Sequence, residues 1–546
     1  MPALPNPFYY LDNFRTVLAW LAGRYDDLLS DDERRFVAGF GALPAVSQAL
    51  LVRMVMRKGE LFRASKLRYA EIGDAGAAAV PLVEAGWLDA QPELTLPQLF
   101  GLFTLGELAE VFGTVARGAR KAELLARLAP EHVAARRLAD WWPTAGDTVY
   151  CVSVDALCER LRLMFFGNLR QAWSEFVLAD LGIYRYEPVP LAPSSRGFQT
   201  RQDIDDYLHL HRCRERLAQG EAPEALFADI PATALDNAWL EARRARLLFQ
   251  LAQQHEKARA WPAALALYQA IRHPGARGRA IRMLERCERY ADALALAEAA
   301  ALAPESEAES QQLGRIMPRL RRQLGLARLP APASAAIGQF ELSLPQPAPG
   351  VPVEQAVLAH LRRPEAPVHY VENTLINSLF GLLCWDAIFA PVPGAFFHPF
   401  HSGPADLLAA DFAARRVAQF DACFALLDSG AYREVIRQRY RDKFNTQSPF
   451  VYWGVLDEAL LALALDCLPA SHLRLYFRRL MADIGTNRAG LPDLIQFWPA
   501  ERRYRLVEVK GPGDRLQDNQ IRWLHYCIEH GMPVSVCYVQ WADAAP

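Results

Sequence analysis

Three charged residues near the end of this 546-residue chain have the types and spacing of a metal-dependent hydrolytic site. Asp493 follows Pro492, and Glu508 and Lys510 come fifteen and seventeen residues later, in the run LVEVKGPGDRL. Two carboxylates supply the oxygen ligands that a hard divalent cation prefers, and the main-chain carbonyl of Val509 would add another. A neighbouring lysine can hold and polarise an attacking water. The pattern therefore predicts metal-assisted hydrolysis.

The segment around these residues has alternating strand-like and helical patterns. LPDLIQFW and RYRLVEVKG are predicted as strands, DRLQDNQIRWLHYCIEHG as a helix and PVSVCYVQ as a third strand. Alternation places Glu508 and Lys510 on one face of the second strand, while Asp493 lies among apolar residues of the first. Charges inside apolar strands are costly unless they are paired or bound to a metal. A surface salt-bridge ladder on a hairpin is the alternative to a metal site.

The motifs GLPDL, LVEVKGPGDRL and QIRWL resemble the virus-type replication-repair nuclease (VRR-NUC) domain of the PD-(D/E)xK nuclease superfamily. They are most similar to the version in the Fanconi-associated nuclease family, in a bacterial-type member. Residues 164–187 and 369–389 are similar to the same family. The resemblance implies a multidomain, mainly α-helical protein with a C-terminal α/β nuclease core. It also implies an N-terminal winged-helix and SAP-like region and TPR-like (tetratricopeptide) helical repeats.

The resemblance also assigns roles to residues of the site. Asp493 and Glu508 would bind the metal, Lys510 would be the catalytic lysine, and Glu372, on an upstream helix in YVENTLINSLF, would be a third carboxylate ligand. Gln520, in the QIRWL helix, would approach the site as a polar contact. The implied cofactor is Mg²⁺ or Mn²⁺. From the residue pattern alone, a solvated helix face is the commoner explanation of Glu372, and a plain surface glutamine is an open alternative for Gln520.

The N-terminal residues 1–140 are predicted to form the winged-helix and SAP-like DNA-binding region, and residues 141–199 a connecting helical region. A basic stretch that includes Arg57 and Lys58 has six basic residues and one acidic residue within twenty positions. A helix and a turn leading to a small wing are expected next. Two amphipathic helices joined by a basic turn then follow, and Lys121 opens the second. Arg57, Lys58 and Lys121 are candidate phosphate contacts. An ordinary helical hairpin is the alternative interpretation of the two amphipathic helices.

Residues 200–345 are predicted to form the TPR-like domain, which ends in a proline-rich linker. WPAALALYQAI and YADALALAEAA share an A-L-A-L core at an offset of 29 residues. Residues 241–290 carry eleven basic and four acidic residues. Their densest part provides Arg277, Arg279 and Arg282, which follow a Pro-Gly turn and are expected in the first turn of a helix, where they would bind DNA phosphate. A solvated helix face is the alternative.

Residues 346–546 are predicted to form the nuclease domain, with an arginine-rich helical insertion at about 404–482. In the family that the chain resembles, such an insertion is associated with monomeric action on flaps, whereas small stand-alone VRR-NUC proteins resemble dimeric junction resolvases. We therefore expect a monomer, with a dimer on DNA as the alternative. No CxxC pair occurs in the sequence. The ubiquitin-binding zinc finger of the animal members is therefore not expected.

The overall composition limits the possible classes of protein. The chain carries 60 basic and 62 acidic residues, so any DNA contact must come from local patches and not from a cationic coat. Nine cysteines without a CxxC pair indicate a reducing compartment. The N-terminus lacks the basic region of a signal peptide, and no run of eighteen apolar residues occurs. We expect a cytoplasmic, nucleoid-associated protein that contacts no membrane.

The function that these observations and the resemblance imply is structure-specific DNA repair. The chain would cleave branched DNA at 5′ flaps by metal-dependent phosphodiester hydrolysis, trim DNA in the 5′-to-3′ direction and act in interstrand crosslink repair. Two alternatives stay open. One is a resolvase of four-way junctions, and the other is a non-catalytic scaffold that binds branched DNA.

Overall fold

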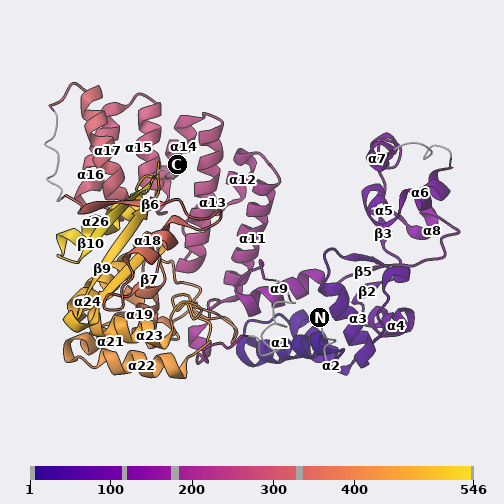
Figure 1. Ribbon diagram of the computed structural model, residues 1–546. Coiled ribbons are helices and arrows are strands. Elements are labelled where there is room, and N and C mark those ends of the chain that lie inside the picture. The colour runs from indigo at the N-terminus through magenta and orange to yellow at the C-terminus, as the bar shows by residue number, and fades with distance from the viewer. Residues whose placement is uncertain (1–5, 114–119, 172, 174–183, 328–335, 543–546) are drawn as a thin grey trace. The chain divides into compact units, whose positions relative to one another are not determined.

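The computed structural model describes residues 6–113, 120–171, 173, 184–327 and 336–542 (Figure 1). The chain divides into two units. The first comprises Met1–Tyr184, Ala192–Ser194 and Phe198–Ile204, and the second comprises Arg185–Leu191, Ser195–Gly197 and Asp205–Pro546. The predicted DNA-binding region is in the first unit, and the predicted repeats and nuclease core are in the second.

The first unit begins with helices beside a small antiparallel sheet of strand order β1-β5-β2. Its elements are α1 (Tyr9–Tyr25), α2 (Asp31–Ala42), α3 (Ala45–Val55), β1 (Leu61–Arg63), α4 (Ala75–Glu84), β2 (Leu88–Asp89), β5 (Val149–Val152) and α9 (Asp155–Phe166). The helix α4 and the strand β2 confirm the expected helix and turn before a small wing. The central strand β5 follows residue 140, the predicted end of this region, and pairs with β1 and β2. A strand of four residues is too short to show a clear alternation.

The SAP-like part lies between β2 and β5. It contains β3 (Glu93–Leu94), α5 (Leu96–Leu102), α6 (Leu105–Phe112), α7 (Lys121–Leu128), β4 (Arg136–Arg137) and α8 (Leu138–Trp141). Leu99, Leu108, Leu124 and Trp141 form its buried core, which confirms the two predicted amphipathic helices. The basic turn predicted between α6 and α7 includes residues 114–119, which lie outside the described residues.

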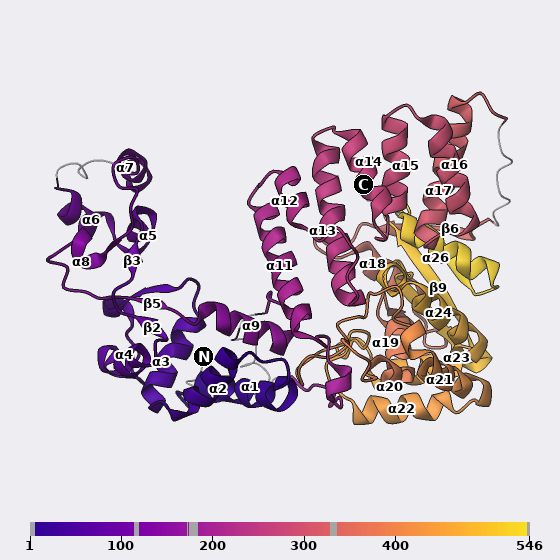
Figure 2. The same cartoon turned by 180° about the vertical axis from the view of Figure 1, so that it is seen from behind.

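The second unit contains a stack of helices in which successive members pack against one another (Figure 2). Alanines such as Ala264, Ala280 and Ala297 are fully buried in their common core and allow the helices to approach closely. The two A-L-A-L segments are both helical, as predicted. The helices are α11 (Arg201–Ala218), which begins in the first unit, α12 (Pro223–Asp229), α13 (Ala238–Lys257), α14 (Trp261–Ala270), α15 (Ala276–Arg286), α16 (Tyr290–Leu302) and α17 (Glu307–Gln323).

A five-stranded mixed sheet forms the nuclease core, with strand order β6-β10-β9-β8-β7. Its strands are β6 (Gln339–Pro345), β7 (Val368–Tyr370), β8 (Leu494–Trp498), β9 (Arg503–Lys510) and β10 (Val534–Ala542). β10 is parallel to β6 and β9, whereas β8 is antiparallel to β7 and β9. With the helix α26 (Asp518–Glu529), this confirms the predicted order strand, strand, helix, strand.

The interpretation of the segment before residue 345 as a linker was wrong for its last part. Residues 339–345 form β6, which pairs along its whole length with β10. The prolines on both sides of QFELSLP hid this edge strand, because proline is tolerated at strand ends and sheet edges. Residues 328–335 of the expected linker lie outside the described residues.

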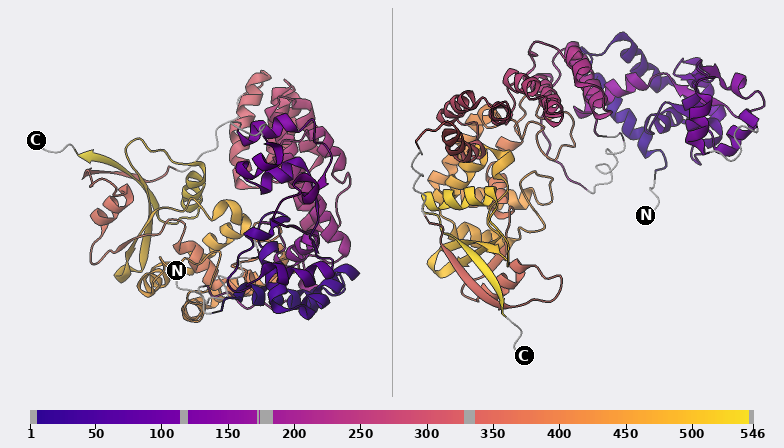
Figure 3. Two further views of the ribbon diagram at one scale, coloured as in Figure 1. Left: turned by 90° about the vertical axis from the view of Figure 1, so that its right-hand side faces the viewer. Right: turned by 90° about the horizontal axis from the view of Figure 1, so that it is seen from above.

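Different helices cover the two faces of the sheet (Figure 3). Val507 and Val509 of β9 pack with residues of α18 (Val353–Leu361), such as Val357. Leu506 of β9 packs on the other face with Trp523 of α26 and with the inserted helices. Glu508 and Lys510 follow the same alternation as Leu506, so they belong to the α26 face.

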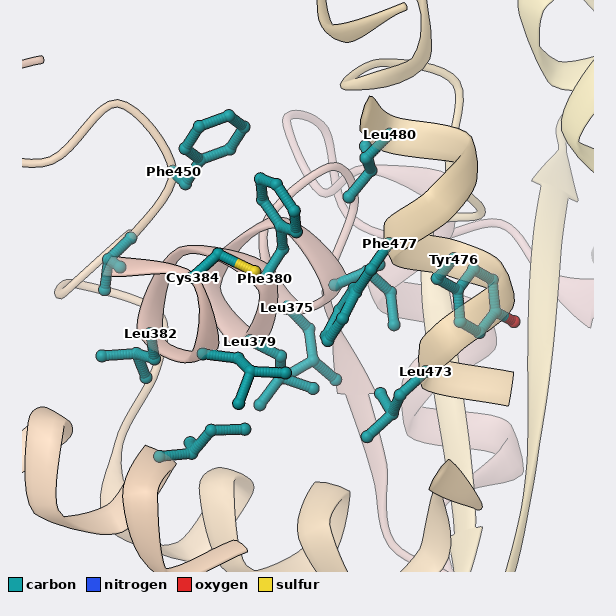
Figure 4. Close-up of a cluster of buried hydrophobic side chains, with 14 of the residues drawn as sticks. Leu375, Leu379, Phe380, Leu382, Cys384, Phe450, Leu473, Tyr476, Phe477 and Leu480 are labelled. Atoms are coloured by element: carbon teal, nitrogen blue, oxygen red, sulfur yellow. The ribbon is translucent and has the colours of Figure 1, made fainter. Parts of the chain in front are cut away.

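The insertion between β7 and β8 shares an apolar core with the α26 face of the sheet, and Figure 4 shows part of it. Phe380 lies with its ring centroid 4.9 Å from that of Phe450 and 5.6 Å from that of Phe477. The helices are α19 (Leu375–Leu383), α20 (Trp385–Ile388), α21 (Val417–Ser429), α22 (Tyr432–Asp442), α23 (Glu458–Cys467), α24 (Ala470–Ala482) and α25 (Ile484–Asn487). Within the described residues, no single helix is long and apolar enough to cross a membrane. Among these residues, the pair α23 and α24 taken together reaches that length and composition, and the two helices are bent by 107°.

Candidate active site

The register of β8 and β9 brings the two predicted carboxylates together. Leu494 pairs with Val507 in this antiparallel ladder, so Asp493, one residue before β8, lies opposite Glu508. The main-chain N–H of Val509 donates a hydrogen bond to Asp493 Oδ2 over 2.8 Å. Asp493 is therefore held against β9 by the backbone of Val509, the residue whose carbonyl the sequence pattern predicts as a further ligand.

Glu508 and Lys510 lie side by side on β9, as the alternation predicted. Lys510 Nζ is 2.9 Å from Glu508 Oε1 and forms an ion pair with it. Glu508 is completely buried, and within the described residues neither of its carboxylate oxygens accepts a hydrogen bond of good geometry. A buried carboxylate with unused acceptor positions is costly unless a cation satisfies it.

Glu372 lies beside Asp493, but not on a helix as expected. It is in the turn between β7 and α19, because α19 begins only at Leu375. The N–H of Val371 donates to the main-chain carbonyl of Asp493 over 2.8 Å, which continues the pairing of β7 with β8. The charge of Glu372, at the neighbouring strand end, is close enough to act on the pKa values of Asp493 and Glu508.

Burial and mutual repulsion raise the pKa values of both strand carboxylates. Burial raises the pKa of Asp493 to about 6, although its hydrogen bond from Val509 opposes this, and the charge of Glu372 contributes to the rise. Burial, followed by the charge of Asp493, raises the pKa of Glu508 to about 8 in spite of Lys510. A site that penalises carboxylate charge in this way suits a divalent cation, which would remove the penalty.

The residues present fit such a cation by their chemistry. Their donor atoms are carboxylate oxygens, which Mg²⁺ and Mn²⁺ prefer, and the buried oxygens of Glu508 have unused acceptor positions. In the part of the chain that the structure describes, no three His, Cys, Asp or Glu side chains already converge as a complete metal site. Lys510 is paired with Oε1 of Glu508, so Glu508 would have to release Lys510 before this oxygen could bind a metal ion.

Two residues that the sequence analysis did not select also belong to this region. Glu354, in the first turn of α18, adds its negative charge to the effects that raise the pKa of Asp493. Tyr370, the last residue of β7, donates a hydrogen bond from its hydroxyl to Glu372. An acidic residue in a first helical turn is common for dipole reasons alone, so Glu354 gave no separate signal. The position of Tyr370 two residues before Glu372 was the only clue to its contact.

Gln520 has a role at the start of its helix. Its side-chain oxygen accepts a hydrogen bond from the main-chain N–H of Gln517 over 2.8 Å, at the N-terminus of α26. This satisfies one of the free N–H groups at the helix start. The expected approach of Gln520 to the carboxylates therefore stays a prediction, and the structure gives the side chain a capping contact instead.

The predicted phosphate-binding arginines of α15 are engaged in ion pairs. Arg277 forms two hydrogen bonds to the buried Glu309, and Arg279 Nη1 lies 3.1 and 3.0 Å from the two carboxylate oxygens of Glu256. Arg282 is half exposed and lies 3.6 Å from Glu256. Only Arg277 and Arg279 are in the first turn, since α15 begins at residue 276 and places Arg282 in the second.

The predicted contacts in the first unit are also placed. Arg57 donates to the hydroxyl of Tyr69 over 3.3 Å, and Lys58 is exposed in the turn before β1. Lys121 opens α7, as predicted, and its ammonium donates to the main-chain carbonyl of Phe103 over 2.7 Å. A DNA-binding role for these residues remains a prediction.

Comparison with known proteins agrees with the motifs. The model of the FAN1 HTH domain matches residues 8–89, that of the Fanconi anemia-associated nuclease SAP domain matches residues 93–141, and that of the VRR-NUC domain matches residues 427–541.

Relatives match over nearly the whole chain. The Fanconi-associated nuclease 1 homolog of Pseudomonas aeruginosa is 61% identical over 99% of this chain and 97% of its own length. The homolog of Oryza sativa subsp. japonica is 26% identical over 98% of this chain and 63% of its own length. The crystal structure of paFAN1 bound to DNA with a 2-nt 5′ flap and a gap covers 100% of both chains, with a TM-score of 0.90 and 60% identity. The chain therefore belongs to the Fanconi-associated nuclease 1 family and is a nuclease.

Proposed function

We propose that this nuclease cuts the flap strand of 5′-flap and other branched DNA by metal-dependent phosphodiester hydrolysis. The observation that carries the proposal is the meeting of Asp493, Glu508 and Lys510 across β8 and β9. The DNA preference is supported by the likeness to paFAN1, whose crystal structures contain 5′-flap DNA. Trimming in the 5′-to-3′ direction and a role in interstrand crosslink repair belong to the same proposal.

In this proposal, some residues of the site would bind the metal ion and Lys510 would act on the attacking water. Asp493, Glu508 and Glu372, with the main-chain carbonyl of Val509, would hold Mg²⁺ or Mn²⁺. When bound, such an ion would neutralise charge on the scissile phosphate and supply an activated water. Lys510 would donate a hydrogen bond to that water and stabilise the negative charge that develops on the phosphate oxygens.

The proposal places the protein on chromosomal DNA inside the cell, where it acts as a monomer. A resolvase would need two active sites related by symmetry, so native mass measured on a four-way junction and on a flap separates the two functions. One chain per flap supports the proposal. Two chains on the junction, with paired symmetric cuts, would favour the resolvase.

Cleavage of a labelled 5′ flap by the purified full chain in different metals tests the proposal. EDTA should abolish cleavage, and added Mg²⁺ or Mn²⁺ should restore it. Ca²⁺ should support DNA binding without turnover, because it accepts loose geometry and activates water poorly. Full cleavage in chelator would refute metal catalysis. Binding without cleavage in every metal would favour a non-catalytic scaffold.

A further inference from the structure

Both oxygens of the Glu372 carboxylate are held by neighbouring side chains. The Tyr370 hydroxyl donates to Oε2, and the Asn373 amide Nδ2 donates to Oε1 over 3.2 Å. Each carboxylate oxygen can accept two hydrogen bonds or metal contacts. Both oxygens therefore keep an acceptor position while the group is fixed in orientation.

Asn373 also ties this turn to the segment that leads into Asp493. Its side-chain oxygen accepts a hydrogen bond from the N–H of Leu491 over 3.0 Å. Its backbone has φ = 52°, a left-handed conformation that asparagine adopts more readily than most residues. One side chain thus contacts both Glu372 and the residue two positions before Asp493.

A second asparagine supports this connection. Asn377 Nδ2, on α19, donates to the carbonyl of Asn373 over 2.7 Å and to the carbonyl of Arg488 over 2.9 Å. Asn377 is almost completely buried. The turn that carries Glu372 is therefore bound to the chain just before Asp493 at two places, in addition to the strand pairing.

Tyr370 provides the contact from the strand side. It pairs with Leu494 in the β7–β8 ladder, so its backbone position is set by the same strand that begins after Asp493. The residue is 39% exposed, so it is not part of a buried core. A phenol hydroxyl donates a hydrogen bond at neutral pH, which suits a carboxylate that must stay oriented and charged.

We propose that Tyr370 and Asn373 are positioning residues that orient the Glu372 carboxylate toward the divalent cation shared with Asp493. Side chains that hydrogen-bond a metal ligand fix its orientation, and their loss commonly weakens metal affinity about 10- to 100-fold. This inference rests on the proposed role of Glu372 as a ligand. The inference adds Tyr370 and Asn373, which would orient Glu372 and which are not part of the Asp493, Glu508 and Lys510 motif.

The test measures Mn²⁺ affinity directly, by electron paramagnetic resonance of free Mn²⁺ mixed with the full chain. Tyr370→Phe removes only the hydroxyl, and Asn373→Gly removes the amide while keeping the left-handed backbone accessible. Each variant should weaken Mn²⁺ binding about 10-fold or more. The Mn²⁺ concentration for half-maximal cleavage should rise by the same factor. The rate at saturating Mn²⁺ should recover most of its value. The control is Tyr440→Phe, which removes a hydroxyl that donates to the carbonyl of Leu456 over 3.1 Å.

A variant of Glu372 itself distinguishes its proposed role as a ligand from the proposed positioning role of Tyr370 and Asn373. Glu372→Ala should weaken Mn²⁺ binding more than either variant, and adding Tyr370→Phe to it should cause no further loss. Wild-type affinity in Tyr370→Phe and Asn373→Gly, with Glu372→Ala impaired, would overturn the positioning role alone. Wild-type affinity in Glu372→Ala would overturn the ligand assignment of the proposed function. A full additional loss in the double variant would show that Tyr370 acts only through general stability.

Discussion

At the scale of single residues, the site is defined by negative charge that the fold makes costly. Asp493 and Glu508 are buried, with pKa values raised to about 6 and about 8. The folded chain therefore keeps protons on these groups at pH values where the unfolded chain has lost them. Their contribution to stability is consequently greatest at low pH and falls as pH rises toward 8. A bound cation would reverse this loss.

The stabilisation by Mn²⁺ should therefore depend on pH with a defined sign. Protons would compete with the cation at its proposed ligands Asp493 and Glu508, so the rise in melting temperature that Mn²⁺ causes should be larger at pH 8 than at pH 6. Thermal unfolding with and without Mn²⁺ at both pH values measures this rise. The same series with Asp493→Asn is the control and should show a reduced dependence on pH. A wild-type shift that is equal at both pH values, or larger at pH 6, would contradict the assigned ligands.

At the scale of elements, the close approach of two segments positions Asp493. Gly490 has φ = 91°, and a Cβ atom there would lie 2.9 Å from the main chain and side chain of Asn519 in α26. The chain that enters β8 thus passes directly against the start of this helix. Only glycine meets both requirements at once.

Gly490→Ala should therefore damage both stability and activity. We expect a loss of about 1–3 kcal/mol in the free energy of unfolding and a slower cleavage rate, because α26 and the Asp493 segment must move apart. Gly513→Ala is the matched control, since Gly513 also has a positive φ (87°) but no atom within 4 Å of an added Cβ. It should cost about 1 kcal/mol and leave the rate nearly unchanged. Equal effects of the two variants would show that backbone conformation, not the contact with α26, matters.

The helix α15 illustrates how a charge pattern can be misinterpreted. Burial alone would raise the pKa of Glu309, but the hydrogen bonds from Arg277, a backbone hydrogen bond from Glu305 and the charge of Arg277 together lower it. Arg277→Ala should therefore lower the free energy of unfolding by about 1–3 kcal/mol by leaving Glu309 without its partner. Arg282→Ala, at a half-exposed position, should change it by less than about 0.5 kcal/mol. Denaturant unfolding measures both. A stable Arg277→Ala that loses affinity for 5′-phosphorylated flaps would instead restore the phosphate-binding interpretation.

At the scale of the whole molecule, the sequence predicted what depends on local pattern. The order of strands and helix in the last sixty residues, the two A-L-A-L helices and the position of Glu508 and Lys510 on one face of β9 all follow from periodicity. The strand β6 escaped prediction because its partner β10 is almost two hundred residues away and prolines flank it. The turn position of Glu372 and its contacts to Tyr370 and Asn373 depend on the pairing of β7 with β8, which no local pattern encodes. The ion pairs of α15 were missed because their partners, Glu309 in α17 and Glu256 in α13, lie in other helices.

The central claim is that Asp493, Glu508 and Lys510 form the active site. Its most direct test compares cleavage and DNA binding in variants of these residues. Asp493→Ala and Lys510→Ala should each reduce cleavage of a labelled 5′ flap in Mg²⁺ by about 1,000-fold or more, since they remove a proposed metal ligand and the residue proposed to act on the attacking water. Their affinity for the same flap in Ca²⁺ should stay within about three-fold of wild type, because most affinity comes from phosphate contacts elsewhere. A folded variant of either kind that cleaves at nearly the wild-type rate in Mg²⁺ would contradict the assignment of the active site.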